Sequence, residues 1–540
     1  MAKEISTADI FSGGESYTGV QAVERNSKAM ARIYDAIKTS FGPLGLDKMC
    51  VNSAGEVSIT NDGATILQSM LVDDPAAKIL VDLATQQDNE VGDGTTSVVL
   101  MAASLIEKGA RLISSGVHPS VVVSGYKMAF NECIQFIKKS IVRDISTLGA
   151  KALSNIVSTS ISSKVIGSES TLFCEIVVDA LRCIEPSEGG KKIVYPIEDI
   201  NILKHPGGAM GESFLVQGYA MNCALASGFM KKVVKKPRIL CIDFGLQKYK
   251  SPLTVNIVVD DPSKLEDIRK KELEITTNQI KCIAASGATV VLTTRGMDDF
   301  CTKLLLEAGI VGIRRCKKED LDVIARACET SVLSSMSDLS GAENVPTLGS
   351  ANKFEVVSIG EEECVFIEGL KKKMASIILR GANYQLLDEM QRAVHDAICA
   401  LKRTLESKSV VPGGGAVECA LSLMLEKFSF TVNSKEHVAI HRYAESLLSI
   451  PRILAANAGL DPNEIVAKLL AMQGTETSDK SGNSMFGVDA VTGEVQNNVE
   501  AGIIEPSMIK MKSLRAATEA SISILRINEV IMLPPEESRN

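Results

Sequence analysis

The hexapeptide Gly92-Asp93-Gly94-Thr95-Thr96-Ser97, followed at once by the apolar run Val98-Val99-Leu100-Met101, decides how the rest of the chain is interpreted. Its two glycines allow the backbone a positive φ or a close approach to a ligand. Thr95 stands where a helix begins, and the N-terminus of a helix binds anions. An aspartate beside such an N-terminus can hold Mg²⁺ on a phosphate. The motif therefore indicates a phosphate-binding turn, and a plain Gly-Asp-Gly turn with a threonine cap is the alternative.

The composition is that of a globular protein with several domains. The 540 residues are 45% hydrophobic, which is ordinary for a globular protein. The net charge of −8, from 58 basic and 66 acidic residues, is not the excess of positive charge that is typical of a protein that binds nucleic acid. The chain begins without the apolar core of a signal peptide, and no run of about 18 apolar residues predicts a membrane span. Thirteen cysteines without a Cys-x-x-Cys pair indicate reduced thiols. We therefore expect a cytoplasmic protein that binds neither nucleic acid nor a membrane.

The hydrophobic periodicity predicts helical regions at both ends of the chain and an α/β region between them. Apolar residues recur at helical spacing near both ends, whereas helix–glycine–strand units alternate from about residue 218 to about residue 370. Helices are expected at residues 20–41, 76–89, 95–115, 120–142, 384–407, 417–472 (with breaks) and 514–525, and a hairpin is expected at residues 48–51 and 57–60.

Three further glycine-containing turns are candidates for the same binding site. Gly42-Pro43-Leu44-Gly45 ends the first helix, Asn61-Asp62-Gly63 places a carboxylate at a strand-to-helix corner, and Gly413-Gly414-Gly415 precedes a helix. A domain built from both ends of the chain would bring these turns together. Neither a P-loop nor a dinucleotide-binding fingerprint is present, so a nucleotide site would be of another kind.

Two segments are ambiguous when they are considered alone. Residues 246–279 carry a thin apolar stripe among many charged residues, which fits either a solvated surface helix or a protruding element that contacts another molecule. Lys164 follows a run of serines and by itself predicts a solvated loop residue.

Four segments resemble the signature sequences of group II chaperonins, the family of the archaeal thermosomes and of the TRiC/CCT ring in the eukaryotic cytosol. They are Gly42-Pro43-Leu44-Gly45-Leu46-Asp47-Lys48-Met49, Asn61-Asp62-Gly63-Ala64-Thr65-Ile66-Leu67, Gly92-Asp93-Gly94-Thr95-Thr96-Ser97 and Val411-Pro412-Gly413-Gly414-Gly415-Ala416. The resemblance covers essentially the whole chain. Residues 213–222, 406–411 and 504–514 are most similar to one paralogue of the eukaryotic ring.

The resemblance implies a fold of mixed α and α/β class with three domains. A mainly helical equatorial domain would bind ATP, a small intermediate domain would act as a hinge, and an α/β apical domain would bind substrate and carry the helical lid protrusion. The implied boundaries are residues 1–149 and 405–540 for the equatorial domain, 150–217 and 376–404 for the intermediate domain, 218–375 for the apical domain, and about 246–279 for the protrusion.

The resemblance also implies a role for each matching position of an ATP and Mg²⁺ site. Asp93 matches the aspartate that holds the metal, and Asp62 and Asp396 match two carboxylates near the attacking water, with Asp396 the stronger candidate for orienting it. Lys164 matches a lysine that approaches the γ-phosphate. The remaining nucleotide contacts would come from Gly42, Pro43, Gly94, Thr95, Thr96 and Ser97 around the phosphates, Gly414 beside the ribose, and Gly487, Asp489 and Glu500 around the base and ribose.

As a function, the resemblance implies an ATP-hydrolysing chaperone subunit of a double ring. Its partners would be paralogous subunits in a hetero-oligomer and unfolded client proteins of the actin and tubulin class. Two other classes remain open: an ATP-dependent metabolic enzyme, for which the sequence offers no cluster of acid and base groups, and a scaffold that binds no nucleotide. The presence of Asp62, Asp93 and Asp396 argues against the scaffold.

Overall fold

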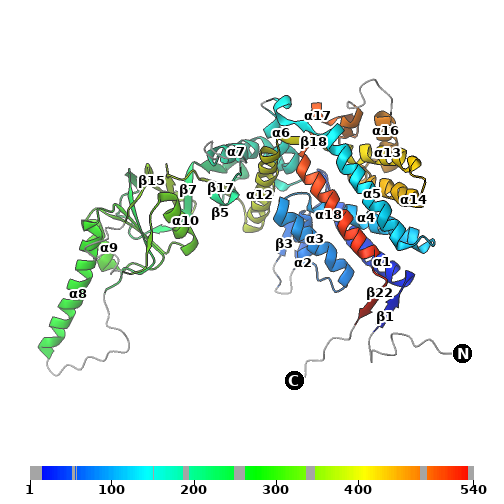
Figure 1. The fold of residues 1–540 in the computed structure, drawn as a ribbon. Helices are drawn as coiled ribbons and strands as arrows, with labels where there is room; N and C mark the ends of the chain where they lie inside the picture. The colour runs from blue at the N-terminus through cyan, green and yellow to red at the C-terminus, as the bar shows by residue number, and fades with distance from the viewer. Residues whose placement is uncertain are drawn as a thin grey trace. The chain divides into compact units, whose positions relative to one another are not determined.

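The chain folds into two compact units. The computed structural model describes residues 15–51, 55, 57–149, 151–185, 194–248, 262–335, 347–474 and 483–532. Met1–Glu175 and Arg392–Asn540 form one unit, here called the terminal unit, and Ile176–Gln391 form the central unit (Figure 1). The boundaries of the three domains named above stay a prediction.

Helix α4 (Thr95–Ser114) is the centre of the terminal unit. It is buried around most of its circumference, as expected of a helix that is apolar on all sides. It packs against α1 (Val20–Ile37), α3 (Pro75–Val91), α14 (Glu436–Leu447) and α18 (Ser507–Leu525). The helix that follows the opening motif therefore forms the core onto which segments from both ends of the chain fold.

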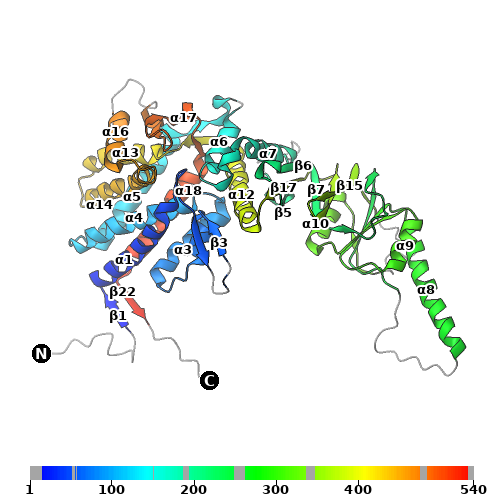
Figure 2. The ribbon, with the colours of Figure 1, turned by 180° about the vertical axis from the view of Figure 1, so that it is seen from behind.

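Strands also join the two ends of the chain inside the terminal unit. β1 (Glu15–Thr18) pairs in antiparallel register with β22 (Glu529–Met532), and the two strands lie side by side in Figure 1 and Figure 2. A second sheet has the order β21–β18–β4. Its strands are Ile504–Pro506, Ser409–Pro412 and Arg143–Asp144. The expectation of a domain built from both ends is confirmed.

The remaining elements of the terminal unit surround this core. Two short hairpins are formed by β2 with β3 and by β19 with β20. The bounds are β2 (Lys48–Val51), β3 (Val57–Thr60), α2 (Gly63–Ser69), α5 (Pro119–Phe136), α6 (Ala152–Ile161), α13 (Ala416–Thr431), α15 (Ser449–Asn457), α16 (Pro462–Gly474), β19 (Phe486–Val488), β20 (Val495–Asn497) and α17 (Asn498–Ala501). Two further helices, α7 (Ser170–Cys183) and α12 (Tyr384–Ser407), contain the points at which the chain passes between the units.

The central unit is an α/β structure built on three parallel strands. β10 (Arg238–Ile242), β11 (Val290–Thr293) and β12 (Val311–Arg314) pair in parallel, and short strands flank them in the order β13–β10–β11–β12–β8. α9 (Asp299–Glu307) contacts β12, and α10 (Lys318–Cys328) contacts β10 and β13. A four-stranded antiparallel sheet has the order β7–β16–β15–β9, and a three-stranded sheet has the order β5–β17–β6. The further strands are β5 (Ile200–Pro206), β6 (Phe214–Val216), β7 (Gly218–Asn222), β8 (Ala224–Leu225), β9 (Val233–Lys235), β13 (Val332–Leu333), β15 (Lys353–Ile359), β16 (Glu362–Glu368) and β17 (Ala375–Gly381).

The segment predicted as a protrusion lies only partly within the described residues. Residues 249–261 are outside them, and α8 (Pro262–Ala285) forms the rest. In both views α8 extends away from the strands of its own unit (Figure 2). The lid function of this segment stays a prediction.

Most predicted elements are confirmed, and three boundaries are wrong. The first helix, expected at residues 20–41, ends at Ile37 and is followed by a 3₁₀ turn, Lys38–Ser40. The long helix expected at residues 384–407 and both strands of the first hairpin have the predicted bounds. α18 begins at Ser507, seven residues before the predicted start, because it follows directly after Pro506 and its first turn already buries Ile509. The helix predicted to reach residue 142 ends at Phe136 and continues as a π-helical turn, Ile137–Ile141.

All thirteen cysteines are free thiols. Within the described residues, no helix has both the length and the apolar character needed to cross a membrane.

Candidate functional site

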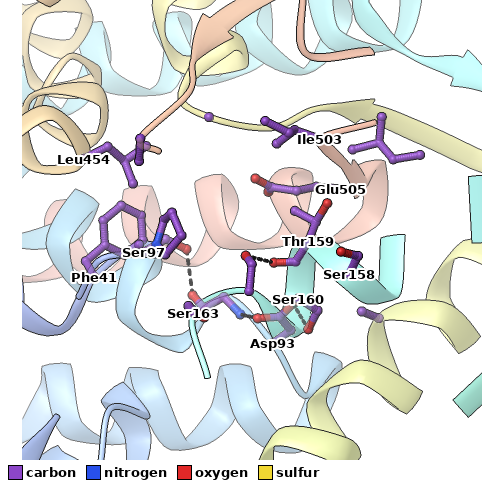
Figure 3. A pocket seen from close by; sticks show the side chains of 18 of the residues that line it. Phe41, Asp93, Ser97, Ser158, Thr159, Ser160, Ser163, Leu454, Ile503 and Glu505 are labelled. Atoms are coloured by element: carbon purple, nitrogen blue, oxygen red, sulfur yellow. Dashed lines mark hydrogen bonds between the residues drawn. The ribbon is translucent and has the colours of Figure 1, made fainter. Parts of the chain in front are cut away.

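A cavity of about 400 Å³ lies in the terminal unit where the glycine turns meet. Residues from both ends of the chain line it, so the prediction that these turns come together is confirmed. In Figure 3, Phe41 and Leu454 lie on one side of the cavity, and Asp93 and Ser160 lie on another. The predicted site residues that line it are Gly42, Pro43, Asp93, Gly94, Thr95, Thr96, Ser97, Lys164, Gly414, Asp489 and Asp396.

The turn around Asp93 is held in shape by its neighbours. Gly92 (φ 78°) ends α3, and Gly94 (φ 77°) precedes α4, so both positions require the left-handed backbone that glycine adopts without strain. The Asp93 carboxylate accepts a hydrogen bond from the backbone N–H of Gly94 (2.6 Å) and one from Ser160 Oγ (3.4 Å). Gln87 donates from Nε2 to the Asp93 carbonyl oxygen (3.1 Å). These contacts fix the aspartate at the edge of the cavity.

The first turn of α4 forms part of the cavity wall. The first N–H groups of a helix have no partner within the helix, and the helix dipole adds partial positive charge there. Thr95, Thr96 and Ser97 occupy this turn and line the cavity. A phosphate group is the kind of ligand that such a terminus binds.

Asp62 lies beside the cavity rather than among the residues that line it. It caps α2, where its carboxylate accepts hydrogen bonds from Thr65 N (3.0 Å), Thr65 Oγ1 (2.7 Å) and Thr95 Oγ1 (3.1 Å). Burial alone would raise the pKa of Asp62, but the Lys164 cation and the hydrogen bonds from Thr65 and Thr95 lower it below its usual value. Asp62 is therefore a carboxylate that ties the corner before α2 to the start of α4.

Lys164 and Asp396 form a buried ion pair in the wall of the cavity. Lys164 Nζ lies 3.1 Å from Asp396 Oδ2, and the two side chains are 10% and 12% exposed. The interpretation of Lys164 as a solvated loop residue is therefore wrong. α6 and the turn after it direct the lysine inward, which a serine-rich sequence does not reveal.

The electrostatics at this end of the cavity are dominated by carboxylates. Burial raises the pKa of Asp93, and burial raises the pKa of Asp396 well above the usual range, although Lys164 opposes both shifts. Asp62 and Asp93 raise the pKa of Asp396 further by repulsion. Three carboxylates around one lysine leave an excess of negative charge, which a cation would compensate.

This donor set fits Mg²⁺ bound together with phosphate. Within the described ranges, no group of three or more His, Cys, Asp or Glu side chains is arranged to hold a metal by itself. Mg²⁺ usually keeps several waters and takes only one or two carboxylates from the protein, with phosphate oxygens as further ligands. Asp93, fixed beside the start of α4, fits the role of that carboxylate.

The glycine turn before α13 and the hairpin β19–β20 form another wall. The Gly414 carbonyl oxygen accepts from the Val488 N–H (2.9 Å), and an added Cβ at Gly414 would come within 2.5 Å of the Val488 carbonyl oxygen. Asp489 lines the cavity, and its carboxylate holds the turn that follows through Val491 N (2.9 Å). Gly487 and Glu500 are not among the lining residues, and Glu500 is exposed on α17.

Sequence reasoning missed a buried ion network beside the cavity. Lys510 Nζ contacts Glu418 Oε1 (2.8 Å) and Glu505 Oε2 (3.1 Å), and both Lys510 and Glu505 line the cavity. Burial raises the pKa of Glu505 despite the attraction of Lys510. Because the three residues come from α13, β21 and α18, no local spacing pattern in the sequence predicts that they form an ion network.

The arrangement combines the start of a helix, the fixed carboxylate of Asp93 and a buried lysine–aspartate pair in one cavity. The chain belongs to the TCP-1/cpn60 chaperonin family, whose model matches residues 33–535. The predicted fold class, a group II chaperonin subunit with mixed α and α/β structure, is thereby confirmed.

Individual relatives make the likeness more specific. The T-complex protein 1 subunit alpha of Encephalitozoon cuniculi is 76% identical over the full length of both chains. The subunit of the same name from Arabidopsis thaliana is 44% identical over 97% of each chain. The thermosome subunit alpha of Aeropyrum pernix is 36% identical over 96% of this chain and 92% of its own. The paralogue that the three segments of the sequence resemble is this alpha subunit.

Proposed function

We propose that this chaperonin subunit binds and hydrolyses ATP with Mg²⁺ in the cavity of the terminal unit, and that hydrolysis drives the folding of enclosed client proteins. The observation that carries the proposal is the buried Lys164–Asp396 pair beside Asp93 and the first turn of α4. An anion-binding helix start next to an excess of carboxylates suits a phosphate chain that arrives with a divalent cation.

Each residue has a distinct part in the proposed reaction. The first turn of α4 binds the phosphates, and Asp93 holds Mg²⁺, which neutralises charge on the transferring group. Asp396 orients and deprotonates the attacking water, and Lys164 stabilises the charge on the terminal phosphate. Asp62 supports this end of the site through its bond to Thr95.

The variant Asp396→Ala tests this assignment. We expect ATP affinity within about threefold of the wild type and hydrolysis slower by about 10²- to 10⁴-fold, because the group that accepts the proton is lost while Asp93 and the first turn of α4 remain. Binding is measured by calorimetry and turnover by phosphate release, on the full-length chain purified in the assembly that it forms. Asp82→Ala, an exposed aspartate on α3, is the control. Wild-type turnover in Asp396→Ala would refute the role of Asp396.

The proposed assembly is a double ring that contains paralogous subunits, located in the cytoplasm, with closure by the protrusion at about residues 246–279. The names of the alpha-subunit and thermosome-subunit relatives support a place in a multisubunit complex. Client proteins of the actin and tubulin class belong to the same proposal.

Tagged protein isolated from its own cells tests the assembly. Electron microscopy is expected to find a double-ringed cylinder, and mass spectrometry is expected to find several related subunits and bound clients. A ring made of this chain alone would remove the hetero-oligomer from the proposal. A compact monomer would overturn the folding chamber altogether.

A further inference from the structure

Asn61 is a buried residue in the wall of the cavity that the reaction described above does not use. It follows β3 and precedes Asp62, the residue that caps α2. Its backbone is held at a fixed corner, because Asp62 N donates to Thr60 Oγ1 (3.1 Å) and the Asp62 carboxylate is bonded to Thr65 and Thr95. Asn61 itself is only 6% exposed, and it lines the cavity.

One end of the Asn61 amide holds a distant segment of the chain. Its Nδ2 donates a hydrogen bond to the carbonyl oxygen of Ser163, 102 positions further along. Because a carbonyl oxygen can only accept, this contact also settles which end of the amide is the nitrogen. Ser163 directly precedes Lys164, so the bond fixes the backbone from which the lysine reaches Asp396.

The other end of the amide has no partner among the described residues. Asn61 Oδ1 is buried and accepts no hydrogen bond from that part of the chain. A buried amide oxygen without a donor is unfavourable, so its surroundings are completed by a group that donates. The phosphate oxygens of ATP accept hydrogen bonds and do not supply this donor. A water held in the cavity beside the phosphate can donate to this oxygen.

We propose that Asn61 is a positioning residue for phosphate hydrolysis. Its Nδ2 holds the segment that carries Lys164, and its Oδ1 accepts a hydrogen bond from a water beside the transferring phosphate. The proposal rests on the function proposed above and adds a residue that none of the roles implied by the family resemblance includes. It concerns the rate of hydrolysis rather than the binding of nucleotide.

The substitution Asn61→Leu removes both hydrogen bonds and keeps the approximate size of the side chain. We expect kcat to fall at least tenfold while the Kd for ATP changes less than threefold, because the helix start that binds the phosphates is left intact. Single-turnover hydrolysis and calorimetric binding are measured on the full-length chain in its assembly. The matched control is Asn89→Leu, an exposed asparagine near the end of α3.

A double variant separates positioning from a merely structural role. If Asn61 acts through the Lys164 segment, the kcat of Asn61→Leu with Lys164→Ala is higher than the product of the two single losses predicts. Fully multiplicative losses, an unchanged kcat in Asn61→Leu, or a loss confined to ATP affinity would each overturn the proposal. Should Asn61→Leu fail to fold, Asn61→Asp tests the contact with Ser163, because a carboxylate cannot donate to that carbonyl oxygen although it can still accept from a water; an unchanged kcat in Asn61→Asp would then overturn the proposal.

The same measurements keep this proposal distinct from the proposed function. A wild-type assembly that neither binds nor hydrolyses ATP would refute the function itself. A wild type that binds and hydrolyses ATP, together with an equally active Asn61→Leu, would refute only the role of Asn61.

Discussion

The carboxylate of Glu445 on α14 stabilises the terminal unit in a pH-dependent way. Glu445 contacts Lys108 of α4 and Arg442 of its own helix. Partial burial would raise the pKa of Glu445, but hydrogen bonds and charge from Lys108 and Arg442 lower it to about 2. Because the pKa is lower in the folded than in the unfolded chain, the stabilisation is complete above pH of about 4.3 and is lost as the pH falls toward 2.

The substitution Lys108→Met tests this contribution. At pH 7 we expect the free energy of unfolding to fall by about 1 kcal/mol, the upper range for a partly exposed pair. At pH 3 the loss is expected to be smaller, because Glu445 is then mostly protonated in the unfolded chain and part of the stabilisation is already gone. Thermal unfolding at both pH values gives the comparison, with Lys78→Met on the exposed face of α3 as control. Equal losses at both pH values would contradict the assignment to Glu445.

The close packing of helix α4 against α5 and α18 depends on Gly109. An added Cβ at Gly109 would come within 2.4 Å of Leu525 on α18 and 3.1 Å of the Tyr126 hydroxyl on α5. In an isolated helix, alanine is more favourable than glycine by about 1 kcal/mol. At this position the expected clash outweighs that gain.

Gly109→Ala is therefore expected to lower the free energy of unfolding by about 1 to 3 kcal/mol, the usual cost of overpacking a core. Denaturation in urea measures the change. Gly474→Ala at the end of α16, where an added Cβ meets no atom of the described residues within 4 Å, is the matched control and is expected to be nearly neutral. A Gly109→Ala variant as stable as the wild type would show that the helices adjust without cost.

Elements with strong local signals could be predicted from the sequence, and contacts between distant segments could not. The bounds of α12 follow from apolar spacing, and those of the first hairpin follow from strand-like segments on either side of a glycine. The glycine turns of the site carry local signals of the same kind. Lys510 meets Glu418 across 92 positions, and only the folded core brings them together. For the same reason, the burial of Lys164 follows from the position of α6 and not from its serine-rich sequence.

On the scale of the whole molecule, the two units differ in whether one continuous stretch of the chain supplies the hydrophobic core. The hydrophobic core of the central unit is built from residues 219–374. The main core of the terminal unit combines residues 23–141 with residues 411–525. The central unit therefore contains its own core, whereas residues 1–175 alone lack the part of the core that residues 411–525 supply.

Fragments of the chain test this difference. A fragment of residues 194–383 is expected to unfold cooperatively by itself, and a fragment of residues 1–175 is expected to lack a cooperative transition. Circular dichroism during heating distinguishes the two cases. Adding residues 392–540 to the fragment of residues 1–175 is expected to restore folding. Cooperative unfolding of residues 1–175 alone would contradict the argument.

The position of β21 and α18 in the cavity wall has a consequence for biosynthesis. Because Glu505 and Lys510 line the cavity, a ribosome must complete nearly the entire polypeptide before the site can close. Nascent or prematurely terminated chains have the helix start and Asp93 but lack this wall. Under the proposed function, ATP binding would therefore be a property of finished chains and not of incomplete ones.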